Sequence, residues 1–410
     1  MQRKILLYII VMTFFLSSAC SAAQWSDVIS IAEKNNNELI SARKQMDAAG
    51  WTLNRAYTNF LPNVSANASM TETTSGGSPE ASKSYSMGLS ATQYLFKGME
   101  NIYGLESAYA DYEYYKANFQ SIRAGVYYDV RSAFLDLLYA EENVVLLEKI
   151  LEQRKENARL IRLRYESGKE DKGNLMRTEA DQAEAEYNLS SAKRDLELAR
   201  LKLSQLLGTQ VDSAEGVVEV SSIEAPELDE LAEKTPAYIM AKWDLKSAEI
   251  DKKSTISGFL PSVSLSGRWS KSGDEWPPER ESSSWSLNLS YSLFPGGSNF
   301  IDTIIYDIRL DKAREVFEKS TKDVRYSLEE SYKGFENALE SLEVRKKSLA
   351  ASEERAKIAR VKYLNGLMTY DEWDRIERDY VNAQKTLLTS QKGALMAEAA
   401  WHKSYGGYVK

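Results

Sequence analysis

Few residues in this chain could do chemistry, and their spacing does not assemble them into a site. The single histidine, His402, stands beside Trp401 in a helical stretch, and the single cysteine is Cys20. Because a zinc site needs several His, Cys or carboxylate ligands at regular spacing, we expect His402 to be a packed helix residue. The sequence also has no glycine-rich phosphate loop and no nucleophile with a matching base. We therefore predict no catalytic, cofactor or metal site and no enzyme activity.

Charge excludes one class of partner. The net charge is −8, so the chain has no basic surface to attract nucleic acid, and no nucleic-acid partner is expected. Most carboxylates alternate with Lys and Arg along helical stretches, which is typical of solvated pairs on helix faces.

The first 23 residues indicate export. A basic start precedes an apolar run from Ile5 to Leu16, and small residues follow up to Ala23, which is the order of a secretory signal peptide. Ordinary cleavage after Ala23 and lipoprotein cleavage before Cys20, which would then be acylated, both remain open. No later stretch reaches 18 consecutive apolar residues, so we expect no transmembrane helix. An exported chain can still enter a membrane as a β-barrel.

An internal repeat organises the rest of the chain. Phe60-Leu61-Pro62 returns as Phe259-Leu260-Pro261, 199 residues later, and Leu95-Phe96-Lys97-Gly98 returns as Leu293-Phe294-Pro295-Gly296, 198 residues later. A repeat nearly half the chain long is a duplicated domain-sized element rather than a solenoid unit. We expect a first repeat at 24–212, an acidic linker at 213–235 and a second repeat at 236–410.

Directly after each Phe-Leu-Pro the hydrophobic period changes from helical to alternating. We expect four strands with one apolar face and one face of Ser, Asn and Thr, at residues 61–72, 84–96, 260–271 and 284–294. Strands of roughly ten residues can cross a bilayer at a tilt. A soluble sandwich would give the same alternation. The neutral polar face, the strand length and the small number of strands favour the membrane.

Long helices are expected in the remainder. Helical periodicity covers residues 25–59, with a break at Asn35-Asn36-Asn37, and residues 99–166, 173–207, 236–258, 298–364 and 370–405. Heptad seams run along several of them, with Leu175, Gln182, Leu189, Leu196 and Leu203 at strict sevens. A periplasmic coiled-coil structural or adaptor protein with a small β-domain would show the same seams.

The strands and helices together favour a conduit. Four amphipathic strands cannot stay in a bilayer as an open sheet, because unpaired edge groups would face hydrocarbon. Four strands are also too few to enclose a wet lumen, so several copies must share one barrel. Two copies would give a filled barrel, and three would give a 12-stranded barrel with room inside. Both strand pairs begin and end in helices, so the helices continue the barrel on one side.

The chain resembles the TolC family of outer membrane factors. The resemblance rests on the repeat, the Phe-Leu-Pro and Leu-Phe-x-Gly motifs at the strand ends, and Lys/Arg-Tyr-x-x-Gly at the two helix turns. It implies a mainly α fold with a small β part, in which four transmembrane β-strands per chain contribute to a 12-stranded trimeric barrel continued by a long antiparallel α-helical periplasmic tunnel. It also implies a homotrimer in outer membrane lipid, with a periplasmic adaptor (membrane fusion) protein and an inner membrane transporter of RND, ABC or MFS type as partners. The implied function is the exit duct of a tripartite efflux pump for small molecules, with type I protein secretion as the alternative.

The resemblance places the functional residues at the two helix turns. Adaptor docking is implied for Tyr165, Gly168, Tyr363, Gly366, Leu367 and Thr369. The first turn keeps the glycine but lacks the Leu and Thr of the second. A ring of acids that attracts cations to the tunnel entrance is implied for Asp371, Glu372 and Asp374. At the position of a second acid of the family, one helical turn later, this chain has Arg375. The alternative is that these acids cap the start of the last helix, where they also suit the helix dipole.

Overall fold

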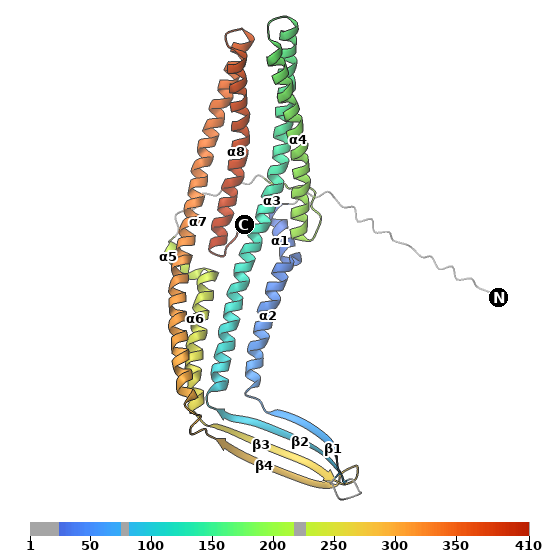
Figure 1. Ribbon diagram of the computed structural model, residues 1–410, viewed down its shortest axis with the longest axis vertical. Helices are drawn as coiled ribbons and strands as arrows, with labels where there is room; N and C mark the ends of the chain where they lie inside the picture. Colours follow the sequence, from blue (N-terminus) through green and yellow to red (C-terminus); the bar gives the residue numbers. More distant parts are fainter. Residues whose placement is uncertain (1–23, 75–81, 217–226, 410) are drawn as a thin grey trace, which may run out of the picture.

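The computed structural model describes residues 24–74, 82–216 and 227–409. The predicted signal peptide and Cys20 lie outside these residues, as does part of the predicted linker. Figure 1 shows a small sheet at one end of the chain and long helices that lead away from it. Among the described residues, none of the helices combines the length and the apolarity needed to span a membrane.

The sheet has four antiparallel strands in the order of the chain. They are β1 (Asn63–Thr73), β2 (Ser82–Lys97), β3 (Ser262–Gly273) and β4 (Arg280–Ser290), and the sheet order is β1-β2-β3-β4. Serine hydroxyls pair across its polar face, at 2.8 Å between Ser65 and Ser90 and 2.9 Å between Ser266 and Ser286. β1 and β4 each pair with one neighbour within the described sheet, so both outer edges are open.

β4 differs most from the sequence pattern. Its alternation predicts residues 284–294, but the strand begins at Arg280 and ends at Ser290. The reason is its partner: Ser290 pairs with Ser262, the first residue of β3, which directly follows Pro261. Proline lacks the amide that would continue the ladder, so the alternation from Tyr291 to Leu293 has nothing to pair with.

Near the sheet the helices form one layer. It contains α2 (Asn37–Thr58), the first part of α3 (Glu100–Glu166), α6 (Pro236–Ser254) and the first part of α7 (Ser298–Leu364). α1 (Trp25–Asn35) precedes α2, and the chain breaks between them at Asn36, whose side chain accepts hydrogen bonds from the amides of Glu38 and Leu39. α6 ends in a short 3-10 turn, η1 (Thr255–Phe259), before Pro261 and β3.

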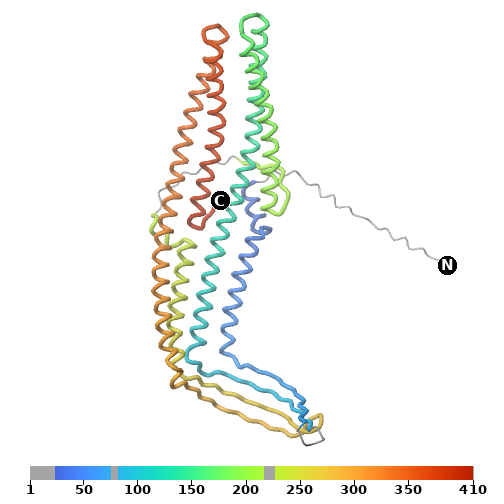
Figure 2. The backbone as a smooth tube through the Cα atoms, in the orientation of Figure 1, coloured from blue at the N-terminus to red at the C-terminus, as the bar shows by residue number. Residues whose placement is uncertain are grey.

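Farther from the sheet, α3 and α7 each turn back into a shorter helix. α3 pairs with α4 (Lys172–Leu207) and α7 with α8 (Tyr370–Ser404), and the two hairpins run side by side to their tips (Figure 2). α3 and α7 contain 67 residues each. The heptad positions of these helices form much of the core, for example Ala185 and Ala192 on α4 and Trp373 and Ala394 on α8.

A helix that the sequence did not indicate, α5 (Leu228–Lys234), lies within the predicted linker. Its Ala232 packs against α7 and Trp401, while Val211 and Ala214, just before the undescribed residues 217–226, join the main core. The two ends of the described chain meet as well, because the Trp25 indole N–H donates to the Val409 carbonyl at 2.9 Å. The mainly helical chain with one small antiparallel sheet confirms the predicted fold class.

Candidate functional site at the helix tips

The two tip turns share one backbone geometry. Gly168 and Gly366 have φ angles of +72° and +73°, in the left-handed region where only glycine is unstrained. In each turn the amide of the glycine and the amide of the next residue bond carbonyls three and five residues back, at 2.9 and 2.8 Å in the first turn and 3.0 and 2.9 Å in the second. This is the Schellman ending of a helix, and it explains why each Tyr-x-x-Gly motif stops its helix.

The six residues predicted for docking divide into exposed and buried positions. Leu367 is 76% exposed and Tyr165 is 39% exposed, and both stand at the outer surface of their turns. Gly168, Gly366 and Thr369 are exposed too, whereas Tyr363 is only 2% exposed. Docking stays a prediction for the five exposed residues, while Tyr363 faces the interior of the chain.

Tyr363 joins the two tips. Its ring stacks on Trp373, with centroids 4.6 Å apart and planes 3° apart, and its hydroxyl donates to a Glu170 carboxylate oxygen at 2.6 Å. The Arg164 guanidinium lies 4.7 Å from the centre of the ring. Burial and the Glu170 carboxylate raise the pKa of the Tyr363 phenol, so it stays a hydrogen-bond donor. The second tip is thereby held on the first.

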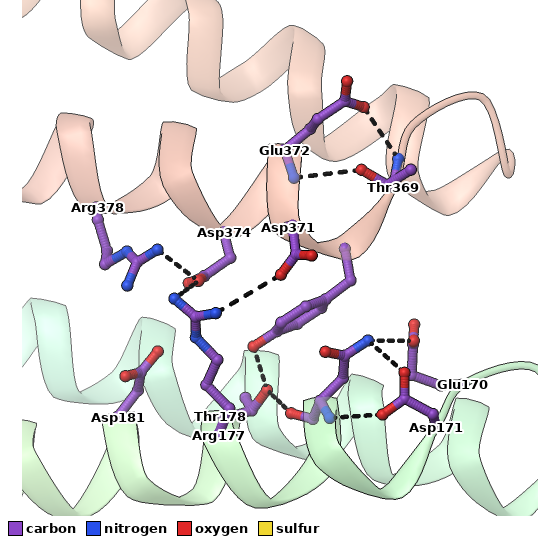
Figure 3. Close-up of polar contacts among 12 residues, drawn as sticks. Glu170, Asp171, Arg177, Thr178, Asp181, Thr369, Asp371, Glu372, Asp374 and Arg378 are labelled. Carbon is purple, nitrogen blue, oxygen red and sulfur yellow. Dashed lines mark hydrogen bonds and ion pairs between the residues drawn. The ribbon is translucent and has the colours of Figure 1, made fainter.

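The start of α8 carries a capping box (Figure 3). The Glu372 amide donates to the Thr369 hydroxyl at 3.3 Å, and the Thr369 amide donates to the Glu372 carboxylate at 3.2 Å. Such a pair satisfies two amides that have no partner within the helix. The sequence left open whether these acids cap the start of the last helix. Glu372 does cap it, and its side chain is also exposed.

Asp374 differs from its neighbours because it is 2% exposed and surrounded by arginines. Its carboxylate lies 3.1 Å from Arg177, 3.0 Å from Arg378 and 3.9 Å from Arg154. Burial raises the pKa of Asp374, and the three arginines oppose this effect. Its negative charge is therefore balanced by arginines inside the chain. Asp371, with its side chain 80% exposed, lies 3.6 Å from Arg177.

Three further tip residues were not found from the sequence. Thr178 and Tyr370 are buried and share a hydrogen bond of 2.7 Å between their hydroxyls, which ties α4 to α8. Glu377 is buried, accepts a hydrogen bond from the Gln153 amide, and has its pKa raised by burial. Polar residues at buried heptad positions are the signal for such contacts, since Thr178 stands on the seam of α4.

Outside the tips, the structure places His402 beside Tyr405, with ring centroids 5.4 Å apart, and burial together with Arg131 lowers its pKa. Among the described residues no three His, Cys, Asp or Glu side chains lie close enough to hold a metal ion.

Comparisons with known proteins identify the family. The family model "Outer membrane efflux protein" matches residues 28–209 and 228–407, one match in each half of the chain. The chain is 20% identical to the outer membrane efflux protein BepC of Brucella suis over 377 residues, which are 90% of this chain and 80% of BepC. It is 24% identical to the outer membrane protein OprJ of Pseudomonas aeruginosa over 375 residues, 84% of this chain and 76% of OprJ.

Solved structures show the same fold. A CusC crystal structure superposes with a TM-score of 0.86 at 17% identity and covers 94% of this chain and 92% of that one. The resemblance to the TolC family is confirmed, and the family consists of channels rather than enzymes. The chain belongs to the outer membrane efflux protein family and is a TolC-like efflux channel of the outer membrane.

Proposed function

We propose that three copies of this chain form the exit duct of a tripartite efflux pump, which passes small molecules from an inner membrane transporter and a periplasmic adaptor to the outside. The observation that carries this proposal is the pair of open sheet edges on β1 and β4. In a membrane these edges must pair, and three four-stranded sheets close into a barrel wide enough for a lumen. The repeats at 24–212 and 236–410 would each supply one strand pair and one tip.

The test measures both the assembly of the protein and its transport activity. Extracted membranes should yield a heat-modifiable trimer, and deletion of the gene should make the cell sensitive to compounds that the complete gene lets it tolerate. Recovery as a monomer without detergent would contradict the channel proposal. A trimer whose loss stops the export of a protein, with no change in small-molecule tolerance, would point to secretion instead.

Adaptor docking is proposed at the exposed tip residues, with Leu367 at the centre. The matched control is Lys169, which follows the glycine of the first tip just as Leu367 follows that of the second. Leu367→Glu puts a charge in place of an exposed apolar anchor, and it should abolish efflux while trimers remain in the membrane. Lys169→Glu should change efflux less than twofold. Unchanged efflux from Leu367→Glu would remove Leu367 from the docking surface.

A cation-attracting entrance is proposed for Asp371 and Glu372, which keep exposed carboxylates. Three copies would gather these charges around one opening and focus a negative field on it. Asp371→Asn should lower the cation selectivity of the channel in a planar bilayer, and the effect should shrink at high salt. Asp311→Asn is the control, because it removes an exposed carboxylate from the part of α7 near the sheet, far from the tips, and it should leave selectivity unchanged.

A further inference from the structure

The polar face of the sheet carries an arginine whose neighbours on that face are all uncharged. Arg268 lies near the middle of β3, six residues after Ser262 and five before Gly273, the two ends of the strand. Its Cα partners are Ser90 on β2 and Ser284 on β4. Its side chain is exposed. Serine hydroxyls therefore flank the guanidinium on both neighbouring strands, and no carboxylate does.

The strand register assigns every charged strand residue to one face of the sheet, because side chains alternate between the faces. The polar face holds three basic side chains, Lys97, Arg268 and Arg280. Lys97 stands at the end of β2 and pairs with Glu100 at 2.8 Å. Within the described strands the polar face has no carboxylate, and neither Arg268 nor Arg280 forms an ion pair with a described residue.

The apolar face treats its charges differently. Lys271 and Glu281 are Cα partners on that face, and their charged groups lie 4.0 Å apart. Glu281 also accepts a hydrogen bond of 2.8 Å from the Trp269 indole. Glu72 and Lys83 are Cα partners on the same face. The sheet thus places an opposite charge beside each charge of its apolar face and leaves Arg268 without one on its polar face.

The depth of Arg268 in the membrane indicates where its side chain points. At about 3.3 Å per residue, it lies roughly 20 Å from the helix end of β3 and roughly 17 Å from the loop end. In a strand that crosses a bilayer this position is close to the midplane, where an arginine facing lipid is strongly destabilising. Arg268 must therefore face water, so the polar face of the sheet lines the lumen.

Arg280 lies nearer the outside of the cell than Arg268. It pairs with Ser272, which is four residues, or about 13 Å, farther along β3 than Arg268. The loop before Arg280 carries three carboxylates, those of Asp274, Glu275 and Glu279. Because these acids share the solvent around Arg280, Arg268 is the stronger source of positive potential inside the sheet.

Three copies of the chain would place three Arg268 side chains at one level of the barrel. Twelve strands about 4.8 Å apart and tilted by about 40° put the wall about 12 Å from the axis. The side chains extend inward from the wall, so their charges come within the Debye length of about 8 Å from the axis. A neighbouring copy cannot balance them from its β1, because the polar face of β1 consists of Asn, Ser and Thr alone.

We infer that the Arg268 side chains of three copies form an anion-binding ring inside the barrel, which attracts small organic anions such as carboxylates and sulfonates on their way out. Rings of arginine select anions in pores, and the guanidinium donates paired hydrogen bonds to such groups. The inference rests on the proposed exit duct and adds the class of cargo that its barrel favours.

The ring acts independently of the acids proposed at the tip entrance. The tips lie at the far end of α3 from the sheet (Figure 1), and a helix of 67 residues is about 100 Å long. This distance exceeds the Debye length of about 8 Å many times over, so neither field reaches the other. An entrance that attracts cations and a barrel that binds anions can therefore belong to one duct.

Binding of pyranine, a small fluorescent trisulfonate, to the trimer in a non-ionic detergent tests the ring, with fluorescence anisotropy as the measurement. The unsubstituted trimer should bind pyranine, and the affinity should fall as the salt concentration rises. Arg268→Gln should weaken binding about tenfold, because it removes all three charges of the ring. Lys271→Gln is the matched control, since it removes the same charge from the other face of the same strand and should leave binding unchanged.

A second variant tests the ring without removing the arginine. Ser90→Glu puts a carboxylate on the Cα partner of Arg268, on the same face, so it should neutralise the ring and weaken pyranine binding as Arg268→Gln does. This variant also serves if Arg268→Gln does not assemble.

Gel mobility of heated and unheated samples reports the trimer separately from binding. If the unsubstituted trimer binds no pyranine, or if Arg268→Gln or Ser90→Glu binds it as tightly, the ring is overturned while the proposed exit duct stands. Equal weakening by Lys271→Gln would also overturn the ring, because binding would then follow total charge. If the unsubstituted chain forms no trimer, both proposals fail.

Discussion

Removing the hydroxyl of Tyr363 should loosen the connection between the two tips of one protomer. Tyr363→Phe keeps the ring stacked on Trp373 and deletes only the 2.6 Å hydrogen bond to Glu170. Glu170 keeps the Asn174 amide at 2.8 Å and Arg164 at 4.0 Å, so its carboxylate is not left unpartnered. The lost free energy should therefore lie at the low end of the range for a hydrogen bond to a charged group, at about 1.5 kcal/mol.

Hydrogen exchange measures this loss directly. A destabilisation of 1.4 kcal/mol is a tenfold change in an opening equilibrium, so amides at the two tips that exchange by local opening should exchange about tenfold faster. Amides of the core around Val130 and Phe134, far from the tips, should not change. The measurement is exchange followed by mass spectrometry on the intact oligomer.

The repeat provides the matched control for this experiment. Tyr165 occupies the same place before Gly168 that Tyr363 occupies before Gly366, but it is 39% exposed and its hydroxyl has no hydrogen-bond partner among the described residues. Tyr165→Phe should leave tip exchange unchanged within twofold. If both variants exchange alike, the Tyr363–Glu170 bond does not hold the tips together and the reasoning is refuted.

Three further outcomes are expected. Asp374→Asn should destabilise the tip by about 2 kcal/mol in the same exchange measurement, which is less than the loss of a whole buried ion pair because Arg154 and Arg177 each keep another carboxylate partner. Asp371→Asn removes an exposed ion pair and should cost under about 1 kcal/mol. Equal effects of the two substitutions would contradict the argument from burial. Because burial raises the pKa of Glu377 and of Asp374, the folded tip binds more protons than the unfolded chain, and tip stability should fall as pH rises through the range just above the ordinary carboxyl pKa. Glu377→Gln should reduce that slope and leave the part that Asp374 contributes, and an unchanged slope would show that Glu377 does not contribute to it. Gly366→Ala should lower thermal stability by about 1 kcal/mol, whereas Gly393→Ala within α8 should raise it by about 0.5 kcal/mol; a neutral Gly366→Ala would argue against the left-handed turn.

Most of the fold could be predicted from short stretches of the sequence. The helix break at Asn36 and the return of the chain at Gly168 and Gly366 follow from capping and turn chemistry that a few neighbouring residues determine. The bounds of β4 did not follow from its own residues, because its end is set by the residue at which β3 begins.

The site depended more on tertiary contacts. In the sequence, nothing distinguishes Tyr363 and Asp374 from the exposed residues of the tips. They are buried only because the two hairpins approach each other. Their partners, Glu170 and Arg177, belong to the other half of the chain, about 200 residues away. Spacing within one helix cannot specify such a pair.

The equal length of α3 and α7 limits how this protein can change over time. Each contains 67 residues, and each lies in heptad register with a shorter returning helix. One inserted residue in any of these four helices would rotate every later side chain by about 100° off its seam and misplace its tip. Insertions or deletions of seven residues that recur in both helices of a hairpin and in both repeats would keep every seam in register. Such changes would alter the reach of the tips from the sheet in steps of about 10 Å.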